Sequence, residues 1–215
     1  MQLPDIFKKT SIAIVGALLL IFVAVTHAYA ASFETYPEPT QEEIDAIIAR
    51  ANAAPIYPDK GGRERQSILP ERPKNYPNRT GSILITDDKF SGLIPTGHAA
   101  IVWDREAVIE SLGEGVVWNH NNWYKTHGNV WGVAVKGTTW SEDSDAAIWC
   151  SEQVGKPYNY NFLNTSRRDA FYCSHLVWAG YYDTTGVDIS TSAWGPAIYP
   201  IEILDSPNVR KIYQK

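Results

Sequence analysis

The sequence has few cysteines and no recognisable set of metal ligands. Of the 215 residues only Cys150 and Cys173 are cysteine, and neither stands at a spacing from a histidine that a zinc site requires. We therefore predict no bound metal. Two thiols would allow one disulfide, which is the plainest structural alternative for Cys173. A domain of this size can bury enough core without a cross-link, so the pairing is not required.

Basic residues do not outnumber acidic ones. The chain has 19 Lys and Arg against 24 Asp and Glu, a formal net charge of −5. This balance argues against a general nucleic-acid binder, whose surface would be basic. Aromatic residues are plentiful by contrast, with 8 Trp and 12 Tyr. They suit either a surface that binds carbohydrate or peptide polymers or ordinary packing.

Long apolar runs are missing except near the N-terminus. There, Lys8-Lys9 precede a nearly unbroken apolar run at residues 11–25, and residues 28–30 have the small-x-small pattern of a cleavage site. We predict a secretory signal peptide at residues 1–30, cleaved after Ala30. An uncleaved N-terminal anchor is the alternative, although the run is shorter than the roughly 20 residues of a membrane span. No cysteine stands at the cleavage point, which argues against a lipoprotein. We expect a secreted, periplasmic or cell-wall-associated protein without a stable membrane span after cleavage.

The rest of the chain divides into an N-terminal part, residues 31–80, and a domain, residues 81–215. In the first part Thr40 is a good N-cap for a helix that ends before Pro55, and a proline-rich irregular arm follows. In the domain the pattern predicts strands at 82–86, 97–103, 107–112, 115–118, 130–135 and 209–213. A helix capped by Ser141 ends near Gly155. Strands mixed with helices, without regular βαβ alternation, indicate an α+β fold in which an antiparallel sheet or small barrel packs against helices.

The stretch 171–178 indicates a second helix, with Cys173 in its first turn and Asp169 as a suitable N-cap. A thiol at this place faces unpaired backbone N–H groups and the positive end of the helix dipole. Both favour the thiolate, the form that attacks carbonyl groups. The alternative is a buried structural cysteine.

A cysteine nucleophile needs a base, and histidine is the first candidate. Outside the predicted signal peptide there are four histidines. His175 is two residues from Cys173 and would point away from it on a helix. His120 and His127 lie in a polar stretch, where we expect them to be solvated. His98 differs because it opens an apolar strand.

The strand after His98 supplies a partner. A three-residue loop at 104–106 would place Trp103 opposite Ala107 in a hairpin. His98 would then share a face with Glu110 as a diagonal neighbour, about 7–8 Å apart at the backbone. A slip of one residue would put the two side chains on opposite faces. The alternative for Glu110 is an edge-strand charge that faces water.

Two blocks of the sequence resemble a known family. Gly155-Lys156-Pro157-Tyr158 followed by residues 171–177 is similar to the nucleophile block of NlpC-type peptidoglycan peptidases, which have G-x-P-Y and then a hydrophobic residue before D-C-S-G-L-V. Residues 81–83, 97–102 and 108–110 are similar to the other half of that domain. There a G-D-L strand, a G-H-V-G-I strand and a third polar residue follow in order.

In the ordinary NlpC-type enzymes the cysteine half comes first, whereas here the histidine half does. This order resembles the circularly permuted, YiiX- and YycO-like branch of the papain-like superfamily. Those proteins often carry Y-C-S-E-L-V-W, which is similar to residues 172–178, and their closing segment resembles residues 200–204. The resemblance covers roughly residues 80–214. The chain departs from it at Ser82, where Asp is frequent, and at His175, where Glu or Gln is usual.

The resemblance implies a set of roles. Cys173 would be the nucleophile, His98 the general base and then acid, and Glu110 the group that orients the imidazole. The oxyanion would lie against the Cys173 backbone N–H. Four further side chains are candidates for oxyanion or substrate binding: Tyr158, Tyr172, Ser174 and His175. Simple packing is the alternative for Tyr158. Such a mechanism needs neither a metal nor an organic cofactor.

Three functional hypotheses remain open at this point. The first is a secreted cysteine amidase or peptidase that cleaves amide bonds of peptidoglycan peptides through an acyl-thioester and works as a monomer. The second is a papain-like hydrolase or acyltransferase on lipid substrates. The third is a non-enzymatic wall-binding domain with a Cys150–Cys173 disulfide.

Overall fold

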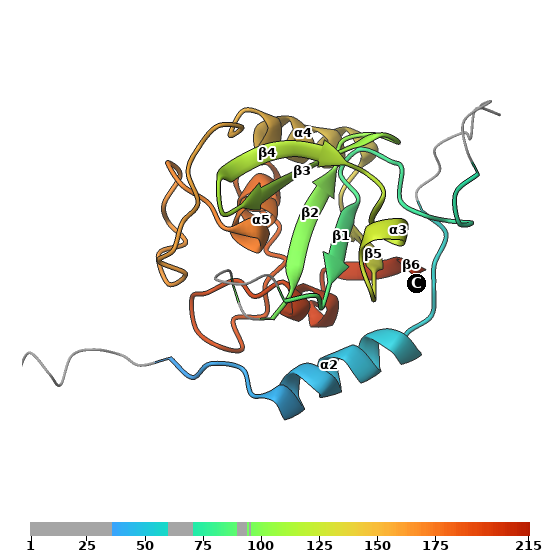
Figure 1. Cartoon of the computed structure of the whole chain (residues 1–215), viewed down its shortest axis with the longest axis horizontal. Coiled ribbons are helices and arrows are strands. Elements are labelled where there is room, and N and C mark those ends of the chain that lie inside the picture. The colour runs from blue at the N-terminus through green and yellow to red at the C-terminus, as the bar shows by residue number, and fades with distance from the viewer. Residues whose placement is uncertain (1–35, 60–70, 90–93, 95) are drawn as a thin grey trace, which may run out of the picture. The chain divides into compact units, whose positions relative to one another are not determined.

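The computed structural model describes residues 36–59, 71–89, 94 and 96–215. The predicted signal peptide and residues 60–70 of the predicted arm lie outside the described residues. Residues 38–215 group into one unit. Its helices and strands, shown in Figure 1, are α2 (Gln41–Ala53), β1 (Ile83–Thr86), β2 (His98–Val102), β3 (Ala107–Leu112), β4 (Gly115–His120), α3 (Trp123–Thr126), β5 (Trp131–Val135), α4 (Trp140–Ser151), α5 (Cys173–Thr185), the 3-10 helix η1 (Ile201–Asp205) and β6 (Val209–Gln214).

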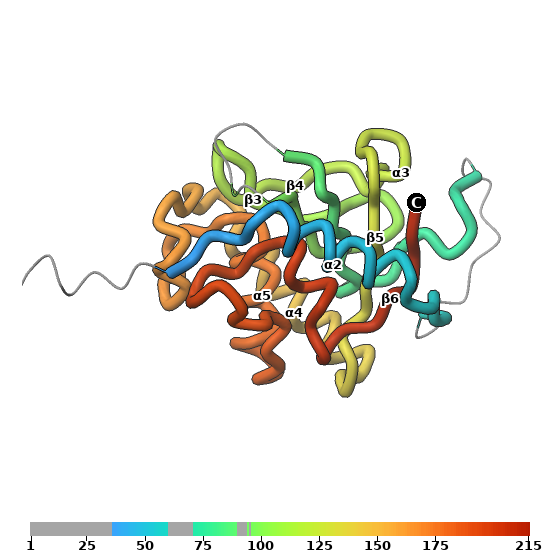
Figure 2. The backbone as a smooth tube through the Cα atoms, turned by 90° about the horizontal axis from the view of Figure 1, so that it is seen from below, coloured from blue at the N-terminus to red at the C-terminus, as the bar shows by residue number. Residues whose placement is uncertain are grey.

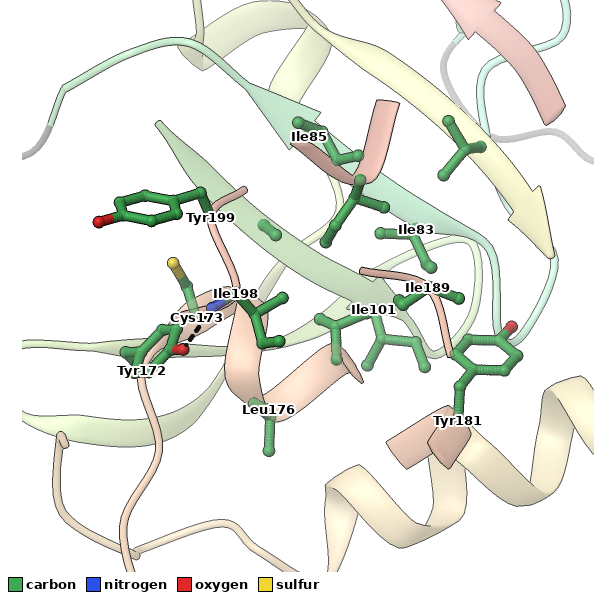
Figure 3. Close-up of a cluster of buried hydrophobic side chains, with 14 of the residues drawn as sticks. Ile83, Ile85, Ile101, Tyr172, Cys173, Leu176, Tyr181, Ile189, Ile198 and Tyr199 are labelled. Carbon is green, nitrogen blue, oxygen red and sulfur yellow. Dashed lines mark hydrogen bonds between the residues drawn. The ribbon is translucent and has the colours of Figure 1, made fainter. Parts of the chain in front are cut away.

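A six-stranded antiparallel sheet with the order β4-β3-β2-β1-β5-β6 forms the framework. Side chains alternate between its two faces. One face, which includes Ile83 and Ile101, packs against residues of α4 and α5 such as Leu176 (Figure 3). The opposite face, which includes Ala100, packs against Trp123 of α3. The predicted α+β fold with a sheet packed on helices, the nucleophile helix among them, is confirmed.

Helix α2 begins where the sequence predicts. Thr40 accepts a hydrogen bond from the Glu43 backbone N–H, and the Glu43 carboxylate accepts one from the Thr40 N–H. Such a capping box satisfies two backbone donors, and an N-cap contributes about 1 kcal/mol. Ile44 and Ile47 are buried, and α2 lies along η1 (Figures 1 and 2). The predicted N-terminal helix therefore packs against the same unit as the sheet.

Two helix starts differ from the prediction. The cap of α4 is Thr139 and not Ser141, because Thr139 makes a capping box with Glu142 while Ser141 lies in the first turn. The predicted cap Asp169 is also wrong. Asp169 instead pairs with Arg167 at 2.6 Å, and Phe171 forms an extended bridge with Tyr158. The chain therefore stays extended up to Tyr172, and α5 starts at Cys173 itself.

The β2–β3 hairpin has the predicted register. Ala100 pairs with Glu110, and the Trp103 N–H donates to the Ala107 carbonyl. The loop is closed by Asp104, whose Oδ1 accepts from the Ala107 N–H at 2.9 Å and from the Glu106 N–H at 2.7 Å. The predicted diagonal arrangement of His98 and Glu110 on one face is confirmed.

The backbone conformation just before His98 requires a glycine at position 97. Its φ is +123°, and a Cβ atom there would lie 2.0 Å from the Thr86 carbonyl oxygen. Thr86 is the cross-strand partner of His98. A side chain at position 97 would thus push apart the two strands that hold the imidazole in place.

Two short elements were not predicted. Helix α3 has four residues and η1 has five, too few for a helical repeat of apolar side chains to be recognised.

Candidate active site

Cys173 is the first residue of α5 and is 1% exposed. Its N-cap residue, Tyr172, makes no side-chain capping bond, so no cap side chain occupies the N–H groups of the first turn. The 13-residue helix directs these donors and its positive dipole end toward the Cys173 segment. The local setting therefore favours negative charge on the sulfur or on a neighbouring oxyanion.

His98 and Glu110 form a buried pair on β2 and β3. His98 Nε2 lies 2.6 Å from Glu110 Oε2, and the two residues are 1% and 3% exposed. Because an ionised carboxylate can only accept, Nε2 carries the proton in this bond. The second carboxylate oxygen, Oε1, accepts from Asn119 Nδ2 at 2.7 Å. Both oxygens of Glu110 are thus hydrogen bonded, which fixes the ring plane of His98.

Each member of this pair stabilises the charged form of the other. Burial lowers the pKa of His98, but the charge of Cys173, its hydrogen bond to the ring and then Glu110 outweigh burial and raise that pKa to about 10. Burial raises the pKa of Glu110, but the bonds from His98 and Asn119 and the charge of His98 hold it below its usual value. At neutral pH the favoured state has an imidazolium between the carboxylate and the sulfur.

Tyr158 forms an isolated β-bridge with Phe171, two residues before Cys173. The residue is 6% exposed, and its hydroxyl oxygen is buried with no partner at normal hydrogen-bond geometry among the described residues. Burial and then the charge of Cys173 raise the pKa of Tyr158, against a smaller opposite effect of the Ile94 backbone. A neutral O–H donor near the thiol is therefore available.

Tyr172 and Ser174 flank Cys173, and both bind the backbone of Ile198. Tyr172 Oη accepts from the Ile198 N–H at 2.8 Å (Figure 3), and Ser174 Oγ donates to the Ile198 carbonyl at 2.5 Å. Tyr172 Oη also donates to the Phe162 carbonyl at 3.2 Å. The hydroxyl groups of these two candidates thus brace neighbouring loops.

His175 points elsewhere. Its Nε2 lies 2.9 Å from the Thr165 carbonyl oxygen, and its ring contacts those of Phe171, Tyr172 and Trp178. The residue is fully buried, and burial lowers its pKa to about 4. This neutral imidazole thus joins α5 to the loop before it.

The sequence analysis missed three neighbours of the His98–Glu110 pair. Asn119 was recognisable in principle, because Glu110 pairs with Val117 and Asn119 is two residues further on the same face. Trp123 and His127 gave no such signal. The expectation that His127 is solvated is wrong: its side chain is 13% exposed and its Nδ1 lies 2.9 Å from Asp88 Oδ2. His120 is exposed, as predicted.

The cysteines do not form a disulfide. Both are free and buried. Cys150 Sγ lies 3.5 Å from the Leu176 carbonyl oxygen, and a Cβ atom at Gly180 would lie 2.6 Å from this sulfur. Cys150 therefore packs against the middle of α5, while Cys173 is at its start. The disulfide-linked hypothesis is wrong.

The fold and the site define a class of protein. A cysteine at a helix start faces a histidine and a carboxylate on adjacent antiparallel strands, and the histidine strand precedes the cysteine helix in the chain. This is a papain-like arrangement in permuted order.

The comparison with protein families agrees. Residues 82–211 match the family described as "Permuted papain-like amidase enzyme, YaeF/YiiX, C92 family", and the chain belongs to that family.

Two relatives were found. The chain is 29% identical to the uncharacterized protein YycO of Bacillus subtilis (strain 168) over 152 residues, which are 68% of this chain and 58% of that protein. The crystal structure of metalloprotein YiiX from Escherichia coli O157:H7 is similar in fold, with a TM-score of 0.51 and 17% identity, and covers 64% of this chain and 98% of its own. In the described part of the present chain no group of three or more His, Cys, Asp or Glu side chains could hold a metal ion.

None of the helices among the described residues is long and apolar enough to cross a bilayer.

Proposed function

We propose that this chain is an exported cysteine amidase that cleaves amide bonds of cell-wall peptides through an acyl-thioester on Cys173. The observation that supports it most is the buried Glu110–His98 pair, which keeps a proton on the imidazole beside the thiol. Nucleophile, base and orienting group are the three parts that such chemistry needs.

In the proposed reaction the thiolate of Cys173 attacks the amide carbonyl carbon. The developing oxyanion is stabilised by the Cys173 N–H at the helix start and by the hydroxyl of Tyr158. His98 gives its proton to the leaving amine, which departs and leaves the acyl group on sulfur. His98, now neutral, takes a proton from water, and the resulting hydroxide hydrolyses the thioester. Glu110 stays ionised and holds Nε2–H throughout.

The substrate class rests on two further points. The N-terminal sequence predicts export, and the sequence is similar to that of peptidases that act on peptidoglycan. Both are compatible with an amide in a cell-wall peptide.

The purified protein, incubated with peptidoglycan, should release peptides or free amines that mass spectrometry detects. Cys173→Ala should lower the rate roughly 10⁴-fold or more, because the nucleophile is lost. Cys150→Ala is the matched control: the other buried thiol is removed at a cost of about 1 kcal/mol of stability, without loss of catalysis.

Two results would contradict the proposal. One is an inert protein on walls of several types. The other is a lipid acyl group on Cys173 after incubation with lipid amides or esters, which would favour a lipid substrate instead.

A further inference from the structure

The imidazole of His98 has a third neighbour besides Glu110 and Cys173. The indole of Trp123 stacks on it, with ring centroids 5.3 Å apart and ring planes 24° apart. Trp123 begins α3 and is 2% exposed. An aromatic face against an imidazolium is a cation–π contact, and its strength increases when water is excluded. The stack therefore favours the charged ring.

Trp123 also contacts a second histidine–carboxylate pair. Its ring centroid is 4.4 Å from that of His127, and His127 Nδ1 lies 2.9 Å from Asp88 Oδ2. The same Asp88 oxygen accepts from the Gly128 N–H at 3.0 Å. The Asp88 N–H donates in turn to Thr86 Oγ1 at 3.1 Å. Asp88 thus ties the C-terminal end of α3 to the end of β1.

These contacts fix the indole relative to His98. Thr86, at the end of this chain of contacts, is the cross-strand partner of His98. The backbone N–H of Trp123 also donates to Tyr76 Oη at 3.0 Å. The indole is therefore held by its own backbone, by His127 and by the strand next to His98.

We propose that Trp123 is a positioning residue that holds the imidazole of His98 in its charged form and correct orientation, and that the Asp88–His127 pair holds Trp123 in place. The inference rests on the proposed role of His98 and deepens it. Trp123 acts through His98.

The charges around the cluster are consistent with this role. His98 faces Glu110, Cys173 and His127, while His127 faces Asp88, Glu110 and His98. The Lys215 ammonium donates to the His127 carbonyl at 2.6 Å. Burial outweighs Asp88 and lowers the pKa of His127, so His127 is neutral at neutral pH. It can therefore hold the indole without placing a second positive charge beside His98.

The test is a titration of the His98 ring by nitrogen-15 NMR in the purified protein. Trp123→Leu keeps an apolar side chain but removes the aromatic face, so the pH at which His98 loses its proton should fall by about 0.5 to 1 unit. Trp123→Phe should retain most of the wild-type value. Val130→Ala changes another buried residue of the same cluster and should leave the titration unchanged. The alkaline limb of kcat/KM should move with the His98 titration in each variant.

An identical His98 titration in wild type and Trp123→Leu would overturn the inference. Should that variant fail to fold, His127→Ala removes the less buried side chain that holds Trp123. The His98 titration should then shift in the same direction by a smaller amount, and an unchanged titration would overturn the inference. The NMR titration needs no substrate. A failure of the proposed cell-wall activity therefore leaves it unaffected, whereas an unchanged titration in an enzyme that depends on Cys173 and His98 overturns this inference alone.

Discussion

Two buried glutamates, Glu110 and Glu202, differ in the hydrogen-bond donors around their carboxylates. Glu110 in the site is 3% exposed and Glu202 in η1 is fully buried. Both oxygens of Glu110 have donors, His98 at 2.6 Å and Asn119 at 2.7 Å. Glu202 accepts a long hydrogen bond from the Thr191 hydroxyl at 3.3 Å and weaker backbone contributions from Thr191 and Tyr199, while its Oε1 is buried with no partner at normal hydrogen-bond geometry among the described residues.

The protonation of the two groups follows from these partners. Burial raises the pKa of both, but at Glu110 the bonds and charge of its neighbours hold the pKa below its usual value. At Glu202 burial dominates and raises the pKa to about 7. Burial by itself therefore favours the neutral acid, and a carboxylate ready for catalysis requires donors placed on both oxygens. Only Glu110 meets this condition.

Among the variants that test this comparison, Glu110→Gln should have the largest effect. The amide keeps the shape but removes the charge that retains the proton on His98, so kcat/KM should fall by about 10²- to 10⁴-fold. The alkaline limb of activity should also move to lower pH, because the pKa of His98 falls. Measured kcat/KM on the released amine tests both points.

The stability of the same variant depends on pH with a definite sign. Because the pKa of Glu110 is lowered by folding, its carboxylate stabilises the fold above the unfolded pKa of about 4.5, and this contribution is lost as the pH falls through the folded value. Wild type and Glu110→Gln should therefore differ in melting temperature at pH 7 and converge near pH 3. Equal activity of the two proteins at pH 7 would rule out an orienting carboxylate.

Glu202→Gln should have the opposite effect on stability: it should stabilise the fold at high pH. The folded pKa is raised from 4.5 to about 7, so the folded state holds a proton that the unfolded chain releases. The stability present below pH 4.5 is then lost as the pH rises to about 7, by on the order of 3 kcal/mol at most. The neutral amide escapes this loss, and the variant should melt higher than wild type at pH 8 but not at pH 4. Denaturant unfolding at the two pH values measures the difference in free energy of unfolding. A variant less stable than wild type at pH 8 would show that Glu202 is ionised and stabilising, as Glu110 is.

The contrast between the glutamates was only half visible in the sequence. Glu110 could be found because the three-residue loop and the alternation of apolar residues define the register of the hairpin, and His98 opens the strand opposite. Cys173 could be found because it stands at a helix start. These signals are local, and local geometry is what a sequence pattern encodes well.

The rest depends on contacts between distant segments. Trp123 reaches His98 only because the β4–β5 connection folds back over the sheet, and His127 meets Asp88 39 residues earlier in the chain. Glu202 is buried in a short 3-10 helix, where residue type alone predicts exposure. The caps at Thr139 and Tyr172 were missed for a smaller reason: several residues near each helix start have suitable side chains, and Tyr172 makes no side-chain capping bond at all.

The smallest effect is expected at Asn119, the second donor to Glu110. Asn119 is exposed, so in Asn119→Ala a water molecule can replace its hydrogen bond to Glu110. We therefore expect kcat/KM to fall less than about tenfold. Asn119→Asp is the sharper variant, because it puts a like charge beside Glu110, raises the pKa of that carboxyl and so weakens its hold on His98. The activity of Asn119→Asp should be lower than that of Asn119→Ala and should fall further as the pH drops toward 5. If both variants match wild type over this range, one donor suffices to keep Glu110 ionised, and the difference from Glu202 is due to His98 alone.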